Sequence, residues 1–303
     1  MVFEVTILGT SSALPTSQRY PSAHVLNVHE RFFLIDCGEG TQMRLRQQRI
    51  RIGKINHIFI SHTHGDHVFG LYGLLSTMNL TGRKNPLYIY APESFGPMMM
   101  SHLDDFDIHL DFSITFIPLR GNNPFVIFEN GFMIVTAFPL VHRVPTYGFI
   151  FREKEMPRNI IGECIREYNI PLASIPAIKK GEDFIEANGN VIPNNVITND
   201  PPISRSYAYC SDTAYFSRLS KFVAGVDLLY HEATFASDKA LLARETGHST
   251  SVEAAMVAKE AGAGKLLLGH YSARYRDVDQ LLAEAKEIFP DVMAGSDGMT
   301  YQV

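Results

Sequence analysis

The sequence predicts an α/β fold, and three observations support this. Short apolar segments rich in β-branched residues are separated by segments whose apolar residues recur at helical spacing. Several of the apolar segments are followed at once by histidine or aspartate, as expected where the loops at strand ends carry a site. With 46% hydrophobic and 19% charged residues, the 303-residue chain has the composition of a globular protein that buries a large core.

Composition also indicates where the chain works. No run approaches the roughly 18 apolar residues of a membrane helix, and Met1–Gly9 is typical of a first strand rather than of a signal peptide. The three cysteines are odd in number and scattered, which favours reduced thiols over disulfides and fits no zinc-ribbon spacing. We therefore expect a cytoplasmic protein that contacts no membrane. A net charge of −5 argues against indiscriminate coating of nucleic acid, although it allows a local basic patch.

The first sixty residues are expected to be rich in strands. Phe3–Gly9, Val25–Val28 and Phe32–Ile35 are short apolar segments separated by turn-forming residues. Helix formers over Gly40–Gln48 predict a helix. Ile55–Ser61 is again apolar and β-branched, so we expect another strand there.

Periodicity predicts the helix that follows this strand. Apolar residues recur three and four positions apart, which places them on one helix face. These residues are Val68, Leu71, Leu74, Leu75 and Met78. The chain enters this helix through His62-Thr63-His64-Gly65-Asp66-His67, so this run lies at the junction of a strand and a helix.

Later strands repeat the pattern of an apolar segment followed by a polar group. The expected strands are Leu87–Tyr90, Phe132–Phe138, Tyr207–Cys210, Leu228–Tyr230 and Leu266–Leu268. The polar groups that follow four of them are His142, Asp212, the pair His231-Glu232, and His270. A shift to mixed charge with four prolines marks 153–193 as an inserted arm, with a short helix over Gly162–Tyr168.

Four metal-binding groups stand within six residues at the first of these junctions. Zinc sites are built from histidine nitrogens and carboxylate oxygens, and a hydrolytic site keeps one coordination position for water. A tight loop after the strand can direct His62 and His64 to one ion, while Asp66 and His67 face a second. Two adjacent ions can stabilise the attacking and the leaving oxygens of a phosphoryl transfer, and they need a bridging carboxylate. The run therefore predicts a dinuclear zinc site.

Structural roles are the alternative explanation for the histidines. Five of them stand in no ligand motif and are expected to be surface or core residues. These five are His24, His29, His57, His102 and His109. For the six-residue run, the alternative is a helix N-cap in which Asp66 accepts backbone N–H groups. Four potential ligands in six residues favour the metal site.

The run His62–His67 resembles the HxHxDH signature of the metallo-β-lactamase superfamily. The resemblance implies an αββα sandwich, in which two mixed β-sheets pack between helices, as a single domain over 1–303 with the arm at 153–193 inserted. It also implies two zinc ions per subunit, at a place where manganese would accept the same ligands. The implied ligands are His62, His64 and His142 for one ion and Asp66, His67 and His270 for the other, with Asp212 bridging.

Further motifs resemble the ribonuclease Z family within this superfamily. They are Phe3–Ser12 with Asp36-Cys37-Gly38-Glu39-Gly40-Thr41-Gln42, the run His231-Glu232-Ala233-Thr234, and His248-Ser249-Thr250. The resemblance covers the chain from Phe3 to Gly298. It implies that Asp66 accepts a proton from the attacking water, while His248, supported by Glu232, protonates the leaving ribose oxygen. A neighbouring carboxylate favours the imidazolium that such an acid requires.

Two histidines of these motifs also have structural alternatives. His231 can be a buried residue bonded to the backbone. His248 can cap a helix over Ser249–Ala258.

Basic residues are the candidates for holding the substrate. Arg274, four residues after His270, is placed to contact a phosphate, with a surface salt bridge as the alternative. A basic cluster on and after the first helix suits an RNA backbone, or else forms a solvated helix face. Its members are Arg44, Arg46, Arg49, Arg51 and Lys54. Lys179 and Lys180 lie in the arm, in a run that resembles the family.

The leading hypothesis is an endoribonuclease that removes the 3′ trailer from a precursor tRNA and leaves a 3′-hydroxyl. Because the arm usually acts across a dimer in the family, we expect a homodimer whose arms help to position the tRNA. A second hypothesis keeps the dinuclear zinc core in a phosphodiesterase for small phosphodiesters. A third is a zinc-holding or RNA-binding module without turnover. Asp66, Glu232 and His248 speak against the third, because metal storage needs no general acid.

Overall fold

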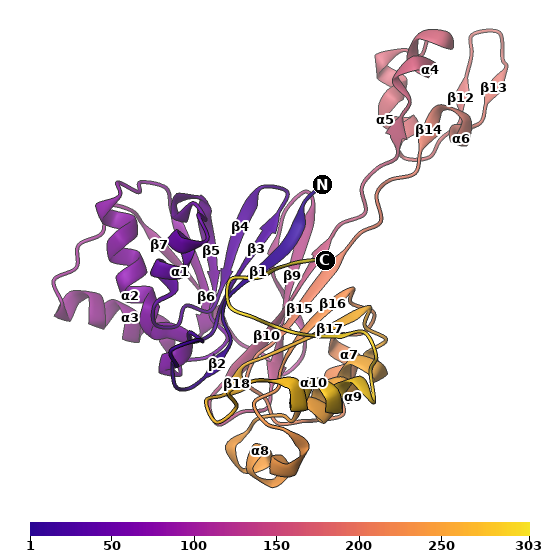
Figure 1. Cartoon of the computed structure of the whole chain (residues 1–303). Coiled ribbons are helices and arrows are strands. Elements are labelled where there is room, and N and C mark those ends of the chain that lie inside the picture. Colours follow the sequence, from indigo (N-terminus) through magenta and orange to yellow (C-terminus); the bar gives the residue numbers. More distant parts are fainter. The chain divides into compact units, whose positions relative to one another are not determined.

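The computed structural model describes all 303 residues, and these divide into two units. The first unit comprises Met1–Phe128, Ile134–Phe151 and Arg205–Val303. The second comprises Glu129–Met133 and Arg152–Ser204 (Figure 1). The arm predicted at 153–193 lies within the second unit.

Two seven-stranded sheets form the centre of the first unit. The first sheet has the order β20-β1-β3-β4-β5-β6-β7 and is parallel from β4 to β7. Its strands are β1 (Phe3–Gly9), β3 (Ala23–Val28), β4 (Arg31–Ile35), β5 (Ile55–Phe59), β6 (Leu87–Pro92), β7 (Ile114–Leu119) and β20 (Thr300–Gln302). The second has the order β19-β17-β16-β15-β10-β9-β8 and is parallel from β15 to β19. Its strands are β8 (Phe125–Glu129), β9 (Met133–Leu140), β10 (Thr146–Glu153), β15 (Ser206–Cys210), β16 (Leu228–Glu232), β17 (Lys265–Gly269) and β19 (Val292–Ala294).

Helices cover the outer faces of both sheets (Figure 1). On the first sheet they are α1 (Thr41–Gln47), α2 (Gly65–Leu80) and α3 (Phe95–Asp105), with the turn η1 (Ile52–Lys54) after α1. On the second they are α7 (Leu219–Phe222), α9 (Ser251–Ala261) and α10 (Asp279–Lys286). The turn η3 (Ser237–Lys239), helix α8 (Ala240–Thr246) and the paired strands β2 (Ser11–Ser12) and β18 (Tyr271–Ser272) complete the unit. The layers run helix, sheet, sheet, helix, so the expected αββα sandwich is confirmed.

Helix α2 is buried on the face that periodicity predicts. Val68, Leu71, Leu74, Leu75 and Met78 are at most 1% exposed, in a cluster with apolar side chains of β5 and β6. The loop after β4 approaches the helix closely, because a Cβ added at position 70, a glycine, would lie 2.0 Å from the carbonyl oxygen of residue 38. This close approach, with hydrogen bonds between residue 37 and residues 67 and 70, brings the first two turns of α2 beside the end of β4.

The layer between the two sheets is aromatic. Phe59 of β5 meets Phe149 and Phe151 of β10 at ring-centroid distances of 5.6 and 5.2 Å. His24 of β3 lies edge-on to Tyr209 of β15 at 4.9 Å. Because these rings are large and buried, the two sheets are held at a fixed spacing beneath the loops at their strand ends.

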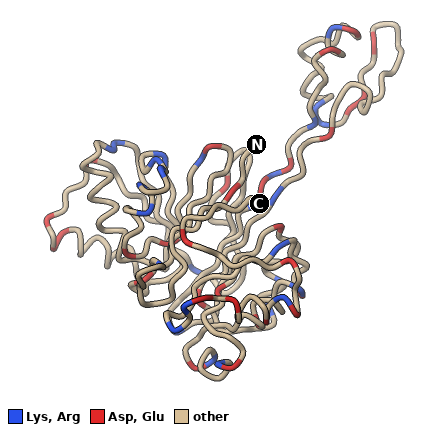
Figure 2. Tube along the Cα trace, in the orientation of Figure 1, with Lys and Arg blue, Asp and Glu red and all other residues tan.

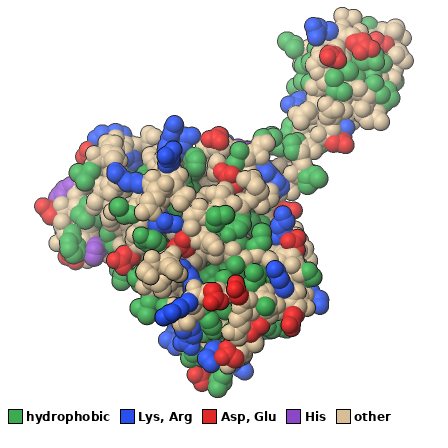
Figure 3. Space-filling model, viewed as in Figure 1, with side chains coloured by type: hydrophobic (Ala, Val, Ile, Leu, Met, Phe, Trp, Pro, Cys, Tyr) green, Lys and Arg blue, Asp and Glu red, His purple; other side chains and the backbone are tan.

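The second unit has a small core of its own. Its elements are β11 (Asn159–Ile160), α4 (Gly162–Glu167), η2 (Leu172–Ser174), α5 (Ile175–Lys179), β12 (Phe184–Ile185), β13 (Val191–Ile192), α6 (Asn194–Ile197) and β14 (Thr198–Asn199). The core consists of Cys164, Ile170, Ile178, Phe184, Ile192 and Ile197. The surface also carries apolar side chains, among them exposed Leu172, Ile185 and Val191 (Figure 3).

The sequence predicted the strands and helices around the site more fully than those at the sheet edges. All nine expected strands, the helices at α1 and α2 and the helix at α4 are confirmed, with ends that differ by a few residues. The helix expected over Ser249–Ala258 is α9, Ser251–Ala261. Strands β7, β8, β10, β19 and β20 and helices α3, α7, α8 and α10 were not predicted. No helix of the structure is long and apolar enough to cross a bilayer.

Candidate metal centre

Loops at the strand ends of both sheets meet at one place in the first unit, and all seven predicted ligands lie there. They are His62 and His64 after β5, Asp66 and His67 in the first turn of α2, His142 after β9, Asp212 after β15, and His270 after β17. Strands β15 and β17 run parallel on either side of β16, so their carboxyl ends share one edge of the second sheet. The topology therefore joins residues that are more than 200 positions apart in the sequence.

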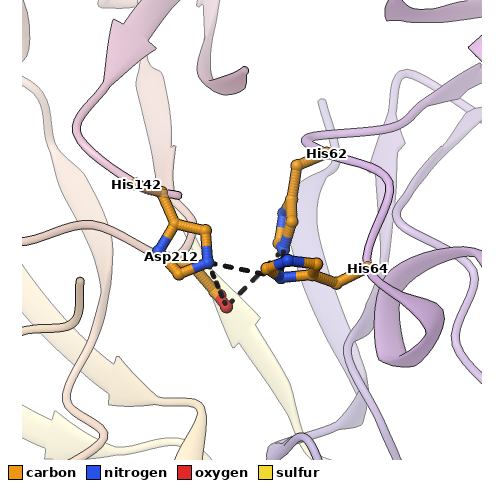
Figure 4. A group of neighbouring side chains, drawn as sticks. All are labelled: His62, His64, His142 and Asp212. Atoms are coloured by element: carbon orange, nitrogen blue, oxygen red, sulfur yellow. Dashed lines mark hydrogen bonds and ion pairs between the residues drawn. The ribbon is translucent and has the colours of Figure 1, made fainter. Parts of the chain in front are cut away.

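Four ligand atoms form a first group (Figure 4). His64 Nδ1 lies 3.1 Å from His62 Nε2 and 3.3 Å from His142 Nε2. Asp212 Oδ2 lies 3.6 Å from His62 Nε2 and 3.9 Å from His142 Nε2. Ligands about 2.05 Å from a tetrahedral zinc ion are about 3.3 Å from one another. The spacing of the group therefore fits one divalent ion.

Asp66, His67, His270 and the other oxygen of Asp212 form a second group. His67 Nε2 lies 3.5 Å from Asp66 Oδ2 and 3.4 Å from Asp212 Oδ1. His270 Nε2 lies 3.6 and 3.2 Å from the same two oxygens. Both of these Nε2 atoms are buried without a hydrogen-bond partner, which a folded protein ordinarily avoids. A divalent ion would satisfy them, and the two oxygens of Asp212 are placed to bridge the two groups.

Hydrogen bonds fix the orientation of four of the histidine rings. The Nδ1–H groups of His62, His67, His142 and His270 donate to Ser61 Oγ (3.0 Å), Asp36 Oδ2 (2.8 Å), Gly247 O (2.7 Å) and Thr234 Oγ1 (3.0 Å), respectively. A donating Nδ1 leaves a lone pair on Nε2, the form that binds a metal. His64 instead directs Nδ1 into the first group, so its N–H lies on Nε2.

Asp36, whose role the sequence did not reveal, anchors the ligand loop. Its carboxylate accepts hydrogen bonds from His67 Nδ1 at 2.8 Å, from Ser61 N and Oγ at 2.7 and 2.9 Å, and from the Tyr209 hydroxyl at 2.7 Å. Tyr209 belongs to the second sheet, so Asp36 also ties the two sheets together beneath the ligands. The signal was present, because Asp36 follows an apolar strand just as Asp212 does.

Glu232, at the end of β16, anchors the other side of the site. Its Oε1 accepts hydrogen bonds from His248 Nδ1 and from the backbone N–H of Thr213, both at 2.9 Å. Its Oε2 accepts hydrogen bonds from the N–H and the hydroxyl of Thr234 at 3.0 and 2.6 Å. Thr213 follows Asp212, and Thr234 accepts the His270 hydrogen bond. One buried carboxylate thus orients His248 and supports the segments of two predicted ligands, Asp212 and His270.

Electrostatics separate the roles of the acidic and basic groups. Burial acts to raise the pKa of Asp66, but the electrostatic influence of the neighbouring His67 and His270 outweighs it, so the pKa of this carboxyl is lowered. Burial acts to lower the pKa of His248, but the charge of Glu232 and its hydrogen bond outweigh it and raise the pKa of His248 to about 9. Asp66 is therefore ionised near neutral pH, and His248 carries a proton that it can donate.

Helix capping does not explain either motif. The N-cap of α2 is His64, whose side chain makes no cap hydrogen bond, while Asp66 Oδ2 accepts a hydrogen bond from the Ala13 N–H at 2.9 Å. Helix α9 is capped by Thr250, in a capping box with Glu253, and not by His248. The structural interpretation does describe His231, which is buried and donates from Nδ1 to the Glu232 carbonyl oxygen at 2.7 Å.

Three residues at the site adopt the left-handed backbone conformation that favours glycine. They are Ala13 (φ 55°), Asp36 (φ 55°) and His270 (φ 58°). Such conformations cost on the order of 1–3 kcal/mol each and persist where the surroundings impose them. Ala13 donates to Asp66, Asp36 accepts from His67, and His270 belongs to the second group, so each strained residue directs a group toward the ligands.

The ligand groups open into a small cavity of about 230 Å³. It is lined by Ser12, Ala13, His64, Asp66, His142, Arg143, Asp212, Thr246 and His248. Asp66 and His248 therefore face the same cavity as His64, His142 and Asp212. Arg143 was not among the predicted site residues, although it follows a predicted ligand directly.

The structure shows that some of the predicted substrate-binding arginines are bonded within the protein and that others are exposed. Arg44 is engaged within the protein, because its Nε donates to the Leu8 carbonyl oxygen at 3.1 Å and its guanidinium lies over the Tyr20 ring. Arg46 is exposed on α1, and Arg49 lies after the helix. Lysine and arginine residues are spread over both units and alternate with acidic residues along the chain (Figure 2).

Arg49, Arg51 and Lys54 line a surface cavity of about 450 Å³, together with Glu4 and Glu30. These three cations therefore share one surface, which Arg44 does not line. Lys54 also lies 3.7 Å from Glu30, so part of this positive charge is already paired.

The remaining predicted contacts lie apart from the ligand groups. Arg274 is exposed, bonds to Ser272 Oγ at 3.0 Å and lies over the Phe235 ring at 5.0 Å; Phe235 is itself 6.2 Å from the His248 ring. No salt bridge is formed by Arg274. Lys179 and Lys180 lie at the end of α5 in the second unit.

The five histidines expected to be structural lie outside both ligand groups. His24 is fully buried and bonds to the Tyr207 hydroxyl at 3.0 Å. His57 stacks on Tyr88 at 5.0 Å.

Known proteins resemble this chain over its whole length. The family model described as "Anti-Pycsar protein Apyc1" matches residues 3–156. The ribonuclease Z of Bacteroides thetaiotaomicron is 43% identical, covering 98% of this chain and 94% of that protein. The crystal structure of human tRNase Z, short form, has a TM-score of 0.72 at 28% identity and 99% coverage of both chains. The Bacillus subtilis metallo-β-lactamase fold protein YhfI has a TM-score of 0.71 at 21% identity, also with 99% coverage of both, which shows the fold alone.

Fold and site together define a metal-dependent hydrolase of the metallo-β-lactamase fold. The two groups of ligand atoms lie in the loops at the strand ends of the sandwich, and a carboxylate-backed histidine faces them. The chain belongs to the ribonuclease Z family, as the resemblance implied, and it is therefore an endoribonuclease.

Proposed function

We propose that the enzyme removes the 3′ trailer from tRNA precursors and leaves a 3′-hydroxyl on the tRNA. The ribonuclease Z relatives and the similarity to human tRNase Z support this substrate. The observation that carries the proposal is that His248, backed by buried Glu232, faces the same cavity as the ligand groups. Cleavage of an RNA phosphodiester expels a poor leaving group, a ribose alkoxide, and such a reaction needs an acid at this position.

The ligand groups are proposed to hold two zinc ions in each subunit. His62, His64 and His142 would hold one ion and Asp66, His67 and His270 the other, with Asp212 shared between them. When bound, divalent ions stabilise negative charge on phosphoryl oxygens and lower the pKa of water. Because manganese accepts the same ligand types, the native metal depends on availability as well as on geometry.

The side chains of the site have separate tasks in this reaction. The ionised Asp66 carboxylate, held by the Ala13 N–H, accepts a proton from the attacking water. Nδ1 of His248 stays bonded to Glu232, so Nε2 is the atom that gives its proton to the departing 3′-oxygen. Glu232 takes no part in bond breaking; it holds the ring and keeps it charged.

Recognition of the tRNA is proposed to use cations outside the metal centre. Arg274 beside the His248 side of the site, and Arg46 and Arg49 near α1, are free to meet phosphates. Arg44 would act mainly by holding α1 in place, since its side chain is bonded within the protein.

The second unit is proposed to be the tRNA-binding arm. It is not basic overall, since it contains six lysine and arginine residues and nine aspartate and glutamate residues. Contact with RNA would therefore rely on Lys179, Lys180 and exposed apolar residues rather than on general attraction. We further propose a cytoplasmic homodimer in which each arm positions the tRNA for the partner's site.

The test is cleavage of a 3′-extended tRNA precursor by the zinc-loaded protein, beside bis-p-nitrophenyl phosphate and with Asp66→Ala as control. The expected result is a single cut near the discriminator nucleotide, lost in Asp66→Ala. Activity on the small diester alone would instead identify a phosphodiesterase for small phosphodiesters. Inactivity on both substrates would leave a metal-holding or RNA-binding module.

A further inference from the structure

Arg143 is an arginine in the metal-site cavity with no ionic partner in the protein. It follows His142 directly and lines the cavity together with Asp66, Asp212 and His248. Its side chain is exposed, it forms no salt bridge, and its single hydrogen bond runs from Nη2 to the Glu245 carbonyl oxygen at 3.2 Å. Most of the donors of the guanidinium are therefore free.

The backbone on the N-terminal side of Arg143 is firmly held. The Val141 N–H donates to Thr213 Oγ1 at 3.1 Å, and the Val141 carbonyl oxygen accepts a hydrogen bond from the Ala214 N–H at 2.8 Å. His142 Nδ1 donates to the Gly247 carbonyl oxygen at 2.7 Å. The guanidinium therefore extends from a fixed base at the rim of the cavity, which lowers the entropy lost when it binds a ligand.

The chemistry of the cavity selects an anionic ligand for this side chain. An arginine fork matches the oxygens of a phosphate and keeps its charge at every physiological pH. Two carboxylates line the same cavity, yet Arg143 pairs with neither of them. A substrate phosphate next to the one that is cleaved could accept hydrogen bonds from the guanidinium of Arg143 and neutralise its charge.

The neighbours of Arg143 indicate which phosphate this is. Both Arg143 and His142 bond to main-chain oxygens of the segment that leads into His248, those of Glu245 and Gly247. In the proposed reaction, His248 protonates the 3′-oxygen of the tRNA nucleotide, so this segment lies beside the tRNA and not beside the trailer. We propose that Arg143 binds the phosphodiester immediately 5′ to the nucleotide that ends in the new 3′-hydroxyl, an inference that rests on the proposed function.

Two substitutions and one matched control test the proposal. Arg143→Ala is expected to lower kcat/KM for the tRNA precursor roughly 10- to 100-fold, as expected for a lost hydrogen bond to a charged group. Arg143→Lys should restore part of the loss. Arg218→Ala is the control, because Arg218 bonds to Asn123 and lies over Phe222, away from the cavity. Hydrolysis of bis-p-nitrophenyl phosphate, which has no neighbouring phosphate, should change less than about threefold in all three variants.

A neutral phosphate analogue identifies the contact itself. A precursor with a methylphosphonate at the proposed position should be cut more slowly by the wild-type enzyme, and Arg143→Ala should add little further loss. Additive losses would overturn the proposal, as would an equal loss on both substrates, which indicates that Arg143 only supports His142. If the wild-type enzyme cuts the small diester but not the unmodified precursor, the proposed function fails and the proposal fails with it. If the wild type and Arg143→Ala cut the precursor equally well, only the proposal for Arg143 is overturned.

Discussion

The carboxylate of Glu232 accepts a hydrogen bond from His248 Nδ1 at 2.9 Å, and it is fully buried while the histidine reaches the cavity. Burial of the carboxylate strengthens its effect on the ring, because little solvent screens the pair. The imidazolium is therefore the stable form of His248 at neutral pH. A general acid speeds the reaction only when the leaving group needs a proton. The loss of activity without His248 should therefore depend on the leaving group.

Replacing His248 should slow the cleavage of RNA far more than the hydrolysis of an activated ester. We predict that His248→Asn lowers kcat on the tRNA precursor by about 10²- to 10⁴-fold, the usual contribution of a general acid. Loss on bis-p-nitrophenyl phosphate should stay within about tenfold, since p-nitrophenolate leaves without protonation. Single-turnover kinetics on the two substrates measure the difference. Equal losses on both would assign His248 a structural role.

Glu232→Gln should destabilise the protein as well as slow it. The carboxylate accepts four hydrogen bonds, and the amide would place an NH₂ group against some of those donors. An unsatisfied buried donor costs about 1–3 kcal/mol. We expect urea denaturation to show a loss of this size, together with reduced cleavage of the precursor. Glu155→Gln, an exposed glutamate in the second unit, is a suitable control. Unchanged stability would contradict the hydrogen-bond network described here.

Asp36→Asn should weaken metal binding without removing a ligand. Its carboxylate accepts the His67 Nδ1–H and so keeps Nε2 free for a metal. Loss of such a partner typically costs 10- to 100-fold in metal affinity. Zinc competition with a chromophoric chelator provides the measurement, with exposed Asp107→Asn as the control. Wild-type zinc affinity in Asp36→Asn would show that Asp36 serves only to join the two sheets.

His24 should make the fold sensitive to mild acid. Burial, aided by the charge of His67, lowers the pKa of His24 to about 3, whereas the unfolded chain titrates near the ordinary value of 6.5. As pH falls below 6.5, His24 binds a proton in the unfolded state but not in the folded state. Stability is therefore lost by up to about 1.4 kcal/mol per pH unit between 6.5 and 3.

Urea denaturation of the wild type and of His24→Gln between pH 7.5 and 5 tests this effect. The variant is expected to be less stable at pH 7.5, because His24 bonds to Tyr207 in the buried layer between the sheets. It should nevertheless lose less stability on acidification. Parallel pH profiles for the two proteins would disprove the assignment.

Residues of the site that lie close together in the sequence could be predicted from the sequence, and those that lie far apart could not be grouped by local pattern. His62, His64, Asp66 and His67 stand within six residues, so the local pattern of a strand, a loop and a helix was enough to group them. His142, Asp212 and His270 were assigned through the resemblance, and the topology of the sheets brings them to the same place. Their assignment as metal ligands stays a prediction.

The groups that the sequence did not reveal act through contacts made by the folded chain. Asp36 meets His67 across 31 positions and Tyr209 across 173 positions. Arg143 contacts Glu245 across 102 positions. No local periodicity encodes such pairs, because each depends on how segments far apart in the sequence pack against one another.

The amino-acid sequence by itself determined the alternation of strands and helices near the site, the local ligand run and the family. These follow from periodicity and from motifs that lie within a few residues. The tertiary structure alone decided the edge strands, such as β20 beside β1, where Thr6 and Thr300 share a hydrogen bond across 294 positions. It also decided which nitrogen of each histidine is free and which arginine faces the cavity. The physical reason is that ring orientation and side-chain access depend on hydrogen bonds and packing between distant segments.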